Sequence, residues 1–419
     1  MTAEPEKPAA AEPEKLTLGR AFLNNVWTTN PVTVTVLAFV LAMLTGGILI
    51  IISDPEVRAT FTYFFARPMD AITASWDVVS AAYADLFKGA IFDPETVKRA
   101  GEGQVPWKQV FYPISETLLY AAPLILTGLS VALAFRGGLF NIGAEGQVIM
   151  GGILATLAGF MLDLPYGLHL LVALVAGFVG GALWGSIAGV LKARTGAHEV
   201  ITTIMLNYIA LYFLVWLITQ DGVQDPGRTD AISAKVDQTA RLPLLAGDPL
   251  RVHLGIVLGV LAAAAAAWLL RRSTFGFELR AVGLNPDAAR TAGMSIGKTY
   301  TMVMLTAGAL AGLGGASQVL GAAFALTPSF SGNVGFTGIT VALLGRAKPW
   351  GVLLAGLLFG AMQAGGNRMQ ISSQISIELV VVIQALIVIF VAAPALVKAI
   401  FQLRAARIGR LETSLARGW

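Results

Sequence analysis

The sequence has no cysteine, only three histidines and few charged residues. Of its 419 residues, 13% are Asp, Glu, Lys or Arg, about half the share found in soluble domains. Without cysteine there is no disulfide framework, no thiolate metal site and no thiol nucleophile. His169, His198 and His253 are too scattered to predict a metal site, and we interpret all three as structural. We therefore expect neither catalytic residues nor a bound metal in this chain.

Apolar residues dominate what is present. They make up 56% of the chain, which also contains 46 glycines and has a mean hydropathy of +0.71. This composition indicates an integral membrane protein surrounded by lipid. The net charge of +4 is consistent with nucleic-acid binding, but cytoplasmic loops of membrane proteins also collect Lys and Arg. We therefore expect no nucleic-acid partner.

Ten apolar runs follow one another along the chain. A helix needs about 20 residues to cross ~30 Å of hydrocarbon, and the runs approach that length, although the eighth is short and interrupted by glycine. They cover residues 31–52, 114–134, 140–160, 167–191, 200–219, 252–270, 299–320, 337–346, 350–366 and 376–397. The sequence predicts an all-α, polytopic membrane protein with about ten transmembrane helices.

The basic residues predict the orientation. With residues 1–30 as a cytoplasmic tail, disordered at its start, most of the 29 Lys and Arg residues fall in inner segments, as the positive-inside rule requires. No cleavable signal peptide is visible, so the first run is expected to insert the chain and remain in it. Residues 31–113 would be one span and a long extracytoplasmic loop, whose order stays open. Residues 398–419 would be a basic cytoplasmic tail.

The core of the protein is predicted to comprise residues 114–397. Within it, spans two to five begin outside and spans seven to ten begin inside. That pattern suggests an inverted repeat, which places a solute path at the interface between the repeats. The acidic loop 220–251 is expected to form a polar, partly ordered extracytoplasmic face.

Glycine recurs every fourth residue in the fourth span, at Gly177, Gly181, Gly185 and Gly189. One face of that helix is almost bare backbone, so a neighbouring helix can approach closely. Two interpretations remain open, dense static packing and a surface along which helices slide during transport.

A polar segment, residues 278–293, separates two apolar spans on the predicted cytoplasmic side. Asn285 can cap a helix, Pro286 fits its first position, and Asp287 complements the positive end of the helix dipole. Gly293 is a suitable C-terminal stop. The segment is either a docking element or a folded loop. The following Gly-Lys-Thr is only a near match to a phosphate-binding loop, because Ala292 replaces the required glycine.

Residues 135–147 interrupt the apolar pattern with four glycines, Arg136, Asn141 and Glu145. Irregular backbone at membrane depth is tolerated only where it is buried in protein or lines a water-filled cavity. An ionisable residue there predicts a functional site. The alternative is that Glu145 pairs with Arg136 or with a helix end and only fixes the fold.

At this segment the sequence resembles a known family. Gly138-Leu-Phe-Asn-Ile-Gly-Ala-Glu-Gly-Gln147 is similar to the signature of permease subunits of ABC importers, in the group that handles nucleosides with a basic-membrane-protein type binding lipoprotein. Four further segments agree, namely Asn207-Tyr-Ile-Ala, Phe275 to Pro286, Gly338 to Arg346, and Glu378-Leu-Val. The resemblance extends over about residues 114–397.

The resemblance implies a type II ABC importer-like permease in the bacterial cytoplasmic (inner) membrane, with both termini cytoplasmic. Its partners would be ABC ATPase subunits, an extracytoplasmic substrate-binding lipoprotein and a second permease. The two permeases would form a heterodimer, and a homodimer of this chain is the alternative. This chain would hold no cofactor, since ATP is bound by the partner subunits. The ATPase coupling helix would be formed by Glu278, Arg280, Gly283, Asn285, Pro286, Asp287, Arg290 and Gly293. The substrate pathway is predicted at Asn141, Glu145, Gln147, Phe140, Asn207 and Asn333.

Other functions are less compatible with the sequence. Ribose-type sugar and branched-chain amino acid permeases belong to the same wider group, so those solutes stay open beside nucleosides. A stand-alone ion-coupled secondary transporter would typically carry several carboxylates or histidines in its spans, whereas Glu145 and Glu378 are nearly alone here. An intramembrane enzyme would need a nucleophile–base pair or a His/Asp/Glu cluster, which the sequence lacks.

Overall fold

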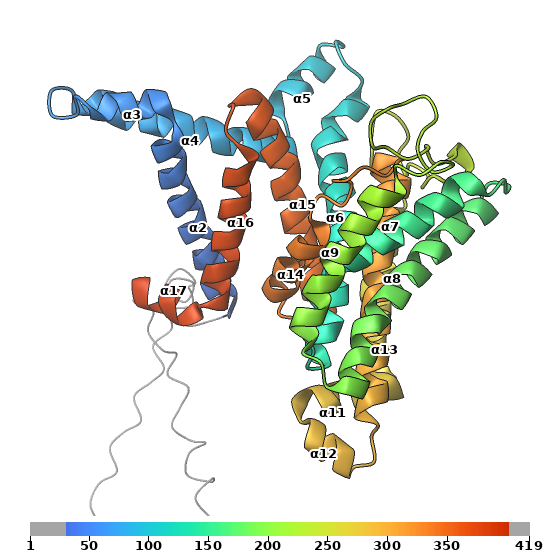
Figure 1. Ribbon diagram of the computed structural model, residues 1–419. Helices are drawn as coiled ribbons and strands as arrows, with labels where there is room; N and C mark the ends of the chain where they lie inside the picture. Colours follow the sequence, from blue (N-terminus) through green and yellow to red (C-terminus); the bar gives the residue numbers. More distant parts are fainter. Residues whose placement is uncertain (1–30, 402–419) are drawn as a thin grey trace, which may run out of the picture.

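The computed structural model describes residues 31–401, and the predicted N-terminal tail and most of the predicted C-terminal tail lie outside that range. The described part is helical (Figure 1). Within it, extended pairing is limited to two isolated bridges, Gln224 with Ser233 and Leu244 with His253. The predicted all-α fold is confirmed.

Each predicted span corresponds to a helix. Seven helices in the described residues are long and apolar enough to cross a membrane. They are α2 (Pro31–Ser53), α6 (Tyr112–Arg136), α7 (Ala144–Met161), α8 (Leu168–Thr195), α9 (Glu199–Leu217), α10 (Gly255–Arg272) and α13 (Ile296–Gln318), which the short π-helix η3 (Val319–Ala323) extends. The remaining predicted spans are α14 (Val334–Leu344), α15 (Pro349–Ser372) and α16 (Ile377–Ala392).

Two of the predicted spans differ from simple crossings. α14 has only 11 residues, about 16 Å at 1.5 Å per residue, which is too short to cross the hydrocarbon. The tenth span stops at Ala392, and α17 (Pro394–Ile400) turns away from α16 by 90°. Pro394 explains the break, because its ring and missing N–H cannot continue the α16 ladder. The inverted repeat stays a prediction.

The long loop predicted at 53–113 is largely helical. It contains α3 (Pro55–Phe61), α4 (Pro68–Ala90), α5 (Pro94–Gly101) and the 3-10 helix η1 (Trp107–Phe111). Asp54 and Asp93 cap α3 and α5 by accepting from the backbone N–H groups of Val57 and Glu95. α4 packs against α15 and α2. The question that the sequence left open is answered, and the segment is ordered.

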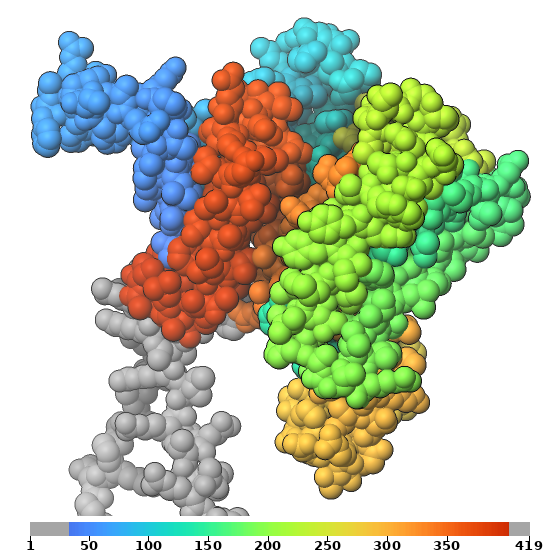
Figure 2. Space-filling model, in the orientation of Figure 1, coloured from blue at the N-terminus to red at the C-terminus, as the bar shows by residue number. Residues whose placement is uncertain are grey.

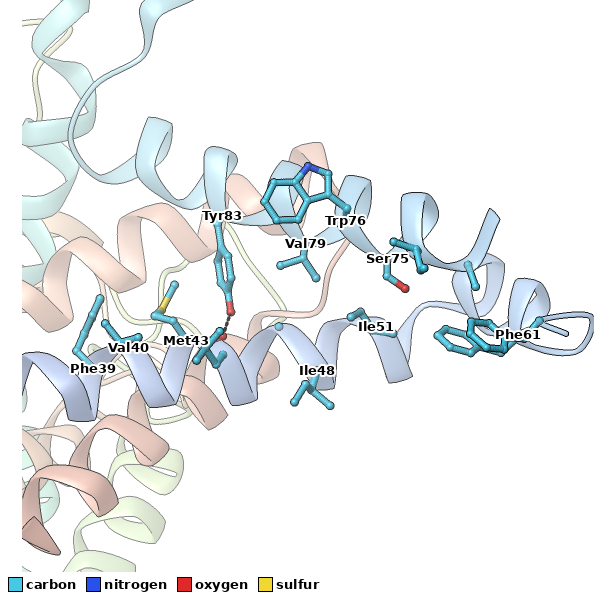
Figure 3. A pocket seen from close by; sticks show the side chains of 15 residues that line it. Phe39, Val40, Met43, Ile48, Ile51, Phe61, Ser75, Trp76, Val79 and Tyr83 are labelled. Carbon is cyan, nitrogen blue, oxygen red and sulfur yellow. Dashed lines mark hydrogen bonds between the residues drawn. The ribbon is translucent and has the colours of Figure 1, made fainter. Parts of the chain in front are cut away.

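An apolar groove of about 570 Å³ separates α2 from α4 (Figure 3). The two helices meet where the Tyr83 hydroxyl donates to the Met43 carbonyl, and they diverge toward the end that carries Phe61. α2, one wall of the groove, has the length and hydropathy of a membrane span.

The glycine face of α8 packs on α13 without space for side chains. A Cβ placed on Gly185 would lie 2.5 Å from the Met304 carbonyl oxygen, and one on Gly189 would lie 2.9 Å from Cα of Thr301. Both distances are shorter than van der Waals contact. Close helix approach, as predicted, is therefore confirmed, and this is dense packing of backbone on backbone. Sliding of these helices stays a prediction.

Buried histidines have structural partners, as predicted. The ring nitrogens of His169 lie 2.7 Å from the Thr239 hydroxyl and 2.9 Å from the Ala158 carbonyl oxygen. His253 accepts from the Gly255 N–H at 3.0 Å. The first pair ties the segment 220–251, with its 3-10 helix η2 (Gln238–Ala240), to α7 and α8. That segment is a folded cap rather than a free loop.

The polar segment 278–293 forms two helices instead of one. α11 (Thr274–Leu284) and α12 (Pro286–Thr291) are separated at Asn285, whose extended backbone ends the first and begins the second. Proline disfavours helical conformation in the residue before it, which explains the break. α11 and α12 protrude from the end of the molecule opposite to α5 (Figure 2).

Candidate functional site

The chain leaves the helical conformation between α6 and α7, at residues 137–143, and two amide side chains hold this loop. Asn141 Nδ2 donates to Gln147 Oε1 at 3.0 Å, and Gln147 Nε2 donates back to Asn141 Oδ1 at 3.2 Å. Asn141 Oδ1 also accepts from the Gly143 N–H at 3.0 Å. Both side chains are fully buried, and these hydrogen bonds hold the loop in place.

Asn207 of α9 fastens the same loop from outside. Its Oδ1 accepts from the Gly146 N–H at 2.8 Å, and its Nδ2 donates to the Ile142 carbonyl at 3.0 Å. The first N–H groups of a helix have no partner within it, and Asn207 supplies one to the first turn of α7. Asn207 therefore links α9 to the start of α7.

Glu145 bonds to the beginning of another helix. Its Oε2 accepts from the Gly335 N–H at 2.8 Å, and the Ser331 hydroxyl and the Phe336 N–H lie beside the same carboxylate. Gly335 lies in the first turn of α14, so a carboxylate there satisfies orphan N–H groups and complements the helix dipole. Of the two structural alternatives, the helix end is the correct one. Arg136 instead donates to the Ala347 carbonyl at 3.0 Å.

A cavity of about 450 Å³ lies beside Glu145, between α7, α9 and the residues that precede α14. Glu145, Asn207 and Asn333 line it, together with Tyr208 and Phe336. Asn333 is exposed and adopts a left-handed conformation (φ 58°) immediately before α14. Three of the six predicted pathway residues therefore meet at one cavity, although their sequence separation exceeds 180 positions.

The other three predicted pathway residues lie outside this cavity. Asn141 and Gln147 bond to each other, as described above. Phe140 is 45% exposed and packs against Phe135, with ring centroids 4.9 Å apart. Asn141 and the residues bonded to it therefore hold the loop that carries Phe140, and the Phe140 ring is partly exposed.

A second polar cavity, about 100 Å³ in volume, lies deeper between α6, α13, α14, α15 and α16. Its polar lining consists of Tyr120, Gln318, Thr337, Gln363 and Gln384. These residues were not predicted from the sequence, because each is an isolated polar side chain in an otherwise apolar span. The sequence did contain a signal for them, because three of them are glutamines within predicted spans, and polar side chains there require internal partners.

At the opposite end, α11 is pressed against the loop after α6. A Cβ on Gly283 would lie 2.9 Å from the Gly138 nitrogen and in closer conflict with the Arg136 carbonyl. Gly138 itself has φ +72°, a conformation that glycine adopts without steric cost. α11 is thus in direct backbone contact with the loop that contains Asn141.

The outer surface of α11 and α12 is rigid and partly apolar. Asn285 Oδ1 accepts from the N–H groups of Asp287 and Ala288, both at 3.1 Å. Leu284 is 88% exposed, and Arg290 and Asp287 form an exposed pair at 3.6 Å.

Comparison with known proteins identifies the family. Residues 114–392 match the model of the branched-chain amino acid transport system permease components. The match covers all helices from α6 to α16 and includes both the Glu145 site and the α11–α12 pair. The chain belongs to this permease family. It is therefore a multi-pass membrane protein and a transport component rather than an enzyme, as the sequence predicted.

Three relatives of the permease illustrate its similarities. The guanosine ABC transporter permease protein NupP of Bacillus subtilis is 44% identical over 293 residues, which cover 68% of this chain and 83% of NupP. The glucose ABC transporter permease protein TsgB13 of Haloferax volcanii is 36% identical over 67% of this chain and 76% of its own length. A second guanosine permease of Bacillus subtilis, NupQ, is 29% identical over 60% and 79%. No solved structure matches the chain significantly.

The predicted coupling residues of the permease take different positions. Asn285, Pro286, Asp287 and Arg290 belong to the α12 helix or its cap, and Gly293 follows it with φ +83°. Glu278, Arg280 and Gly283 belong to α11. The structure thus replaces the single predicted helix with a bent pair. The roles of these residues in ATPase coupling stay a prediction.

Proposed function

We propose that this chain is the permease subunit of an ATP-driven importer that takes up nucleosides across the bacterial cytoplasmic membrane. The observation that carries this proposal is its 44% identity to a guanosine permease over 293 residues, 68% of this chain. The lining of the interior cavities supports it. Apart from Glu145, whose carboxylate is occupied by α14, their polar groups are amides and hydroxyls, which suit a neutral solute, whereas a phosphorylated one needs Arg or Lys.

ATP would be bound and hydrolysed by separate ATPase subunits, and this chain would carry no cofactor. The α11–α12 pair would rest on the ATPase, with Leu284 and the capped helix α12 as the contact surface. Because Gly283 abuts Gly138, displacement of α11 would move the loop held by Asn141 and Asn207. That loop ends at Glu145, which holds α14. The contacts form a mechanical connection from the ATPase side to the interior cavities.

The proposed assembly has a second permease and an extracytoplasmic binding lipoprotein. Support for two different permeases comes from the likeness of this chain to both NupP and NupQ, two guanosine permeases of one organism. Co-expression with a tagged second permease, followed by native mass spectrometry, tests the composition. A complex with two copies of this chain would establish the homodimer instead. Both termini would face the cytoplasm, with the α5 end outside.

Removing the cap of α12 should uncouple the permease from its ATPase. In Asn285→Ala/Asp287→Ala the helix loses its cap and its dipole partner, at a combined cost of about 1–2 kcal/mol. Stimulation of ATP turnover by loaded binding protein, measured in proteoliposomes, should fall severalfold. Arg228→Ala, which breaks an exposed pair at the other end, is the matched control. Full stimulation in the double variant would exclude the coupling role.

The solute itself can be identified by measurement. Calorimetry of the cognate binding protein against guanosine, other nucleosides, ribose, glucose and leucine should give tight binding for nucleosides alone. Uptake by the reconstituted transporter should follow the same order. Glucose is included because TsgB13 is a glucose permease by name. Transport of a sugar or of leucine, with no response to any nucleoside, would overturn the nucleoside assignment and leave the family assignment intact.

A further inference from the structure

A chamber of about 570 Å³ opens at the α5 end of the molecule, on the side opposite to α11 and α12. It lies between the first turns of α6, the last turns of α15, the end of α4 and the segment that leads into α10. Its polar lining includes Tyr112, Glu116, Tyr120, Arg251, Asn367 and Arg368. Its volume is in the range of pockets that bind small molecules.

The charges around the chamber are balanced. Arg251 Nη1 lies 3.0 Å from Glu116 Oε2, and Arg368 Nη1 lies 3.0 Å from Asp93 Oδ2. Burial acts to raise the pKa of Asp93, but hydrogen bonds from Thr96 and the Glu95 N–H, with Arg368 beside it, hold that pKa below its ordinary value. Two cations therefore face two anions, and a solute with net charge would find no unbalanced partner.

Two polar atoms of these pairs have no hydrogen-bond partner. Of the six buried side-chain nitrogen and oxygen atoms that lack one in residues 31–401, Glu116 Oε1 and Arg368 Nε both belong to residues that line the chamber. The Tyr112 hydroxyl lies beside the same Glu116 carboxylate. Buried polar atoms are otherwise almost always paired. Both atoms are shielded from solvent, on side chains that the two ion pairs hold in place, so a solute reaches this acceptor and this donor only by displacing the groups that cover them.

The floor of the chamber leads toward the deeper amide-lined cavity. Tyr120 lines both spaces, and its hydroxyl accepts from Asn367 Nδ2 at 2.8 Å. Tyr120 is thus common to both spaces, whereas Asn367 lines the chamber. Beyond it are Gln363 and Gln384. A neutral solute that breaks the Tyr120–Asn367 hydrogen bond would pass from the polar groups of the chamber to the amide groups of the deeper cavity.

We propose that this chamber is the entry site of the permease, where a neutral solute with hydroxyl groups and a planar ring binds before it crosses the membrane. On binding, the solute uncovers these two shielded atoms: Glu116 Oε1 then accepts from a solute hydroxyl, Arg368 Nε donates to a ring or carbonyl oxygen, and the tyrosines contact the ring. The proposal rests on the proposed nucleoside function and adds the place and the residues of recognition.

The first experiment uses the absence of cysteine in the native chain. Gln370 lines the chamber and is exposed, so Gln370→Cys introduces one accessible thiol into the assembled transporter. Labelling by a water-soluble thiol reagent should slow severalfold when millimolar guanosine is present. Asp230→Cys, on the loop outside the chamber, is the control and should label equally with and without guanosine. Unprotected Gln370→Cys would overturn the entry site.

The second experiment measures discrimination. Glu116→Ala, which removes the acceptor, should reduce the preference for guanosine over its 2′- and 3′-deoxy analogues by about tenfold, because a hydroxyl-binding site rejects analogues that lack the hydroxyl. Asp230→Ala, in an exposed ion pair outside the chamber, should keep the wild-type ratio. A purely structural effect would slow all solutes equally and overturn the proposal. Failure of the wild type to transport any nucleoside would instead refute the underlying function.

Discussion

Replacing Gly312 with leucine should prevent assembly of the helical core. A Cβ on Gly312 would lie 2.8 Å from Cα of Gly181 and closer still to the carbonyl oxygen of Gly177. These neighbours are backbone atoms of α8, which no rotamer change can move. Inserting atoms into a packed core costs about 1–3 kcal/mol and sometimes more, and here α8 and α13 would have to separate along their length.

Fluorescence-detected size exclusion in detergent should show that Gly312→Leu is aggregated or absent, and Gly312→Ala should melt at a lower temperature than the wild type. Gly101→Ala is the control, since a Cβ at Gly101 meets no atom within 4 Å and its backbone conformation is not left-handed. If Gly312→Leu were monodisperse with an unchanged melting temperature, α8 and α13 would not pack as described here.

Glu145→Ala should destabilise the permease and abolish uptake. The substitution leaves the Gly335 N–H without its acceptor and removes the carboxylate beside Ser331 and the Phe336 N–H. Each unsatisfied buried donor costs about 1–3 kcal/mol, with water in the adjacent cavity favouring the lower value. The start of α14 should loosen, and Asn333 with it. Melting temperature and ATP-dependent uptake in proteoliposomes are the measurements.

Glu145→Gln separates the charge of this residue from its hydrogen bonds. Its amide oxygen can still accept from the Gly335 N–H, so most of the stability and part of the uptake should remain. ATP should drive that uptake with or without a proton or sodium gradient. Uptake driven by a gradient through this chain alone would contradict the ABC importer assignment. Equal loss of stability in both variants would indicate that the negative charge itself holds α14.

Local physical rules made much of the fold predictable from the sequence. Long apolar runs determine where helices cross the membrane, because unsatisfied backbone groups are excluded from lipid. The Asn285 cap and the Pro286 start of α12 depend on residues adjacent in sequence, and both were correct. The glycines of α8 predicted close packing correctly, because a helix face without side chains lets a neighbouring backbone approach closely. Each of these predictions depends only on residues that are close together in the sequence.

Partners distant in sequence could not be predicted in this way. Glu145 meets Gly335, 190 positions away, and Asn207 meets the loop of Asn141. Without those distances, the sequence could not separate the six predicted pathway residues from one another, whereas in the tertiary structure Asn141 and Gln147 hold the loop. The order of residues 53–113 was equally unpredictable, because α4 is stabilised by packing on α15 and α2 rather than by its own sequence.

By itself, the sequence determined the all-helical membrane fold, the approximate positions of the spans, the cap of α12 and the family resemblance. These follow from hydropathy, helix capping and motif spacing, which are local properties. Only the tertiary structure decided which polar side chains are consumed by other helices and which face open space. Gln147 is hydrogen-bonded to Asn141, whereas one carboxylate oxygen of Glu116 has no partner. A buried polar group needs a partner, and only the folded chain determines whether one is within reach.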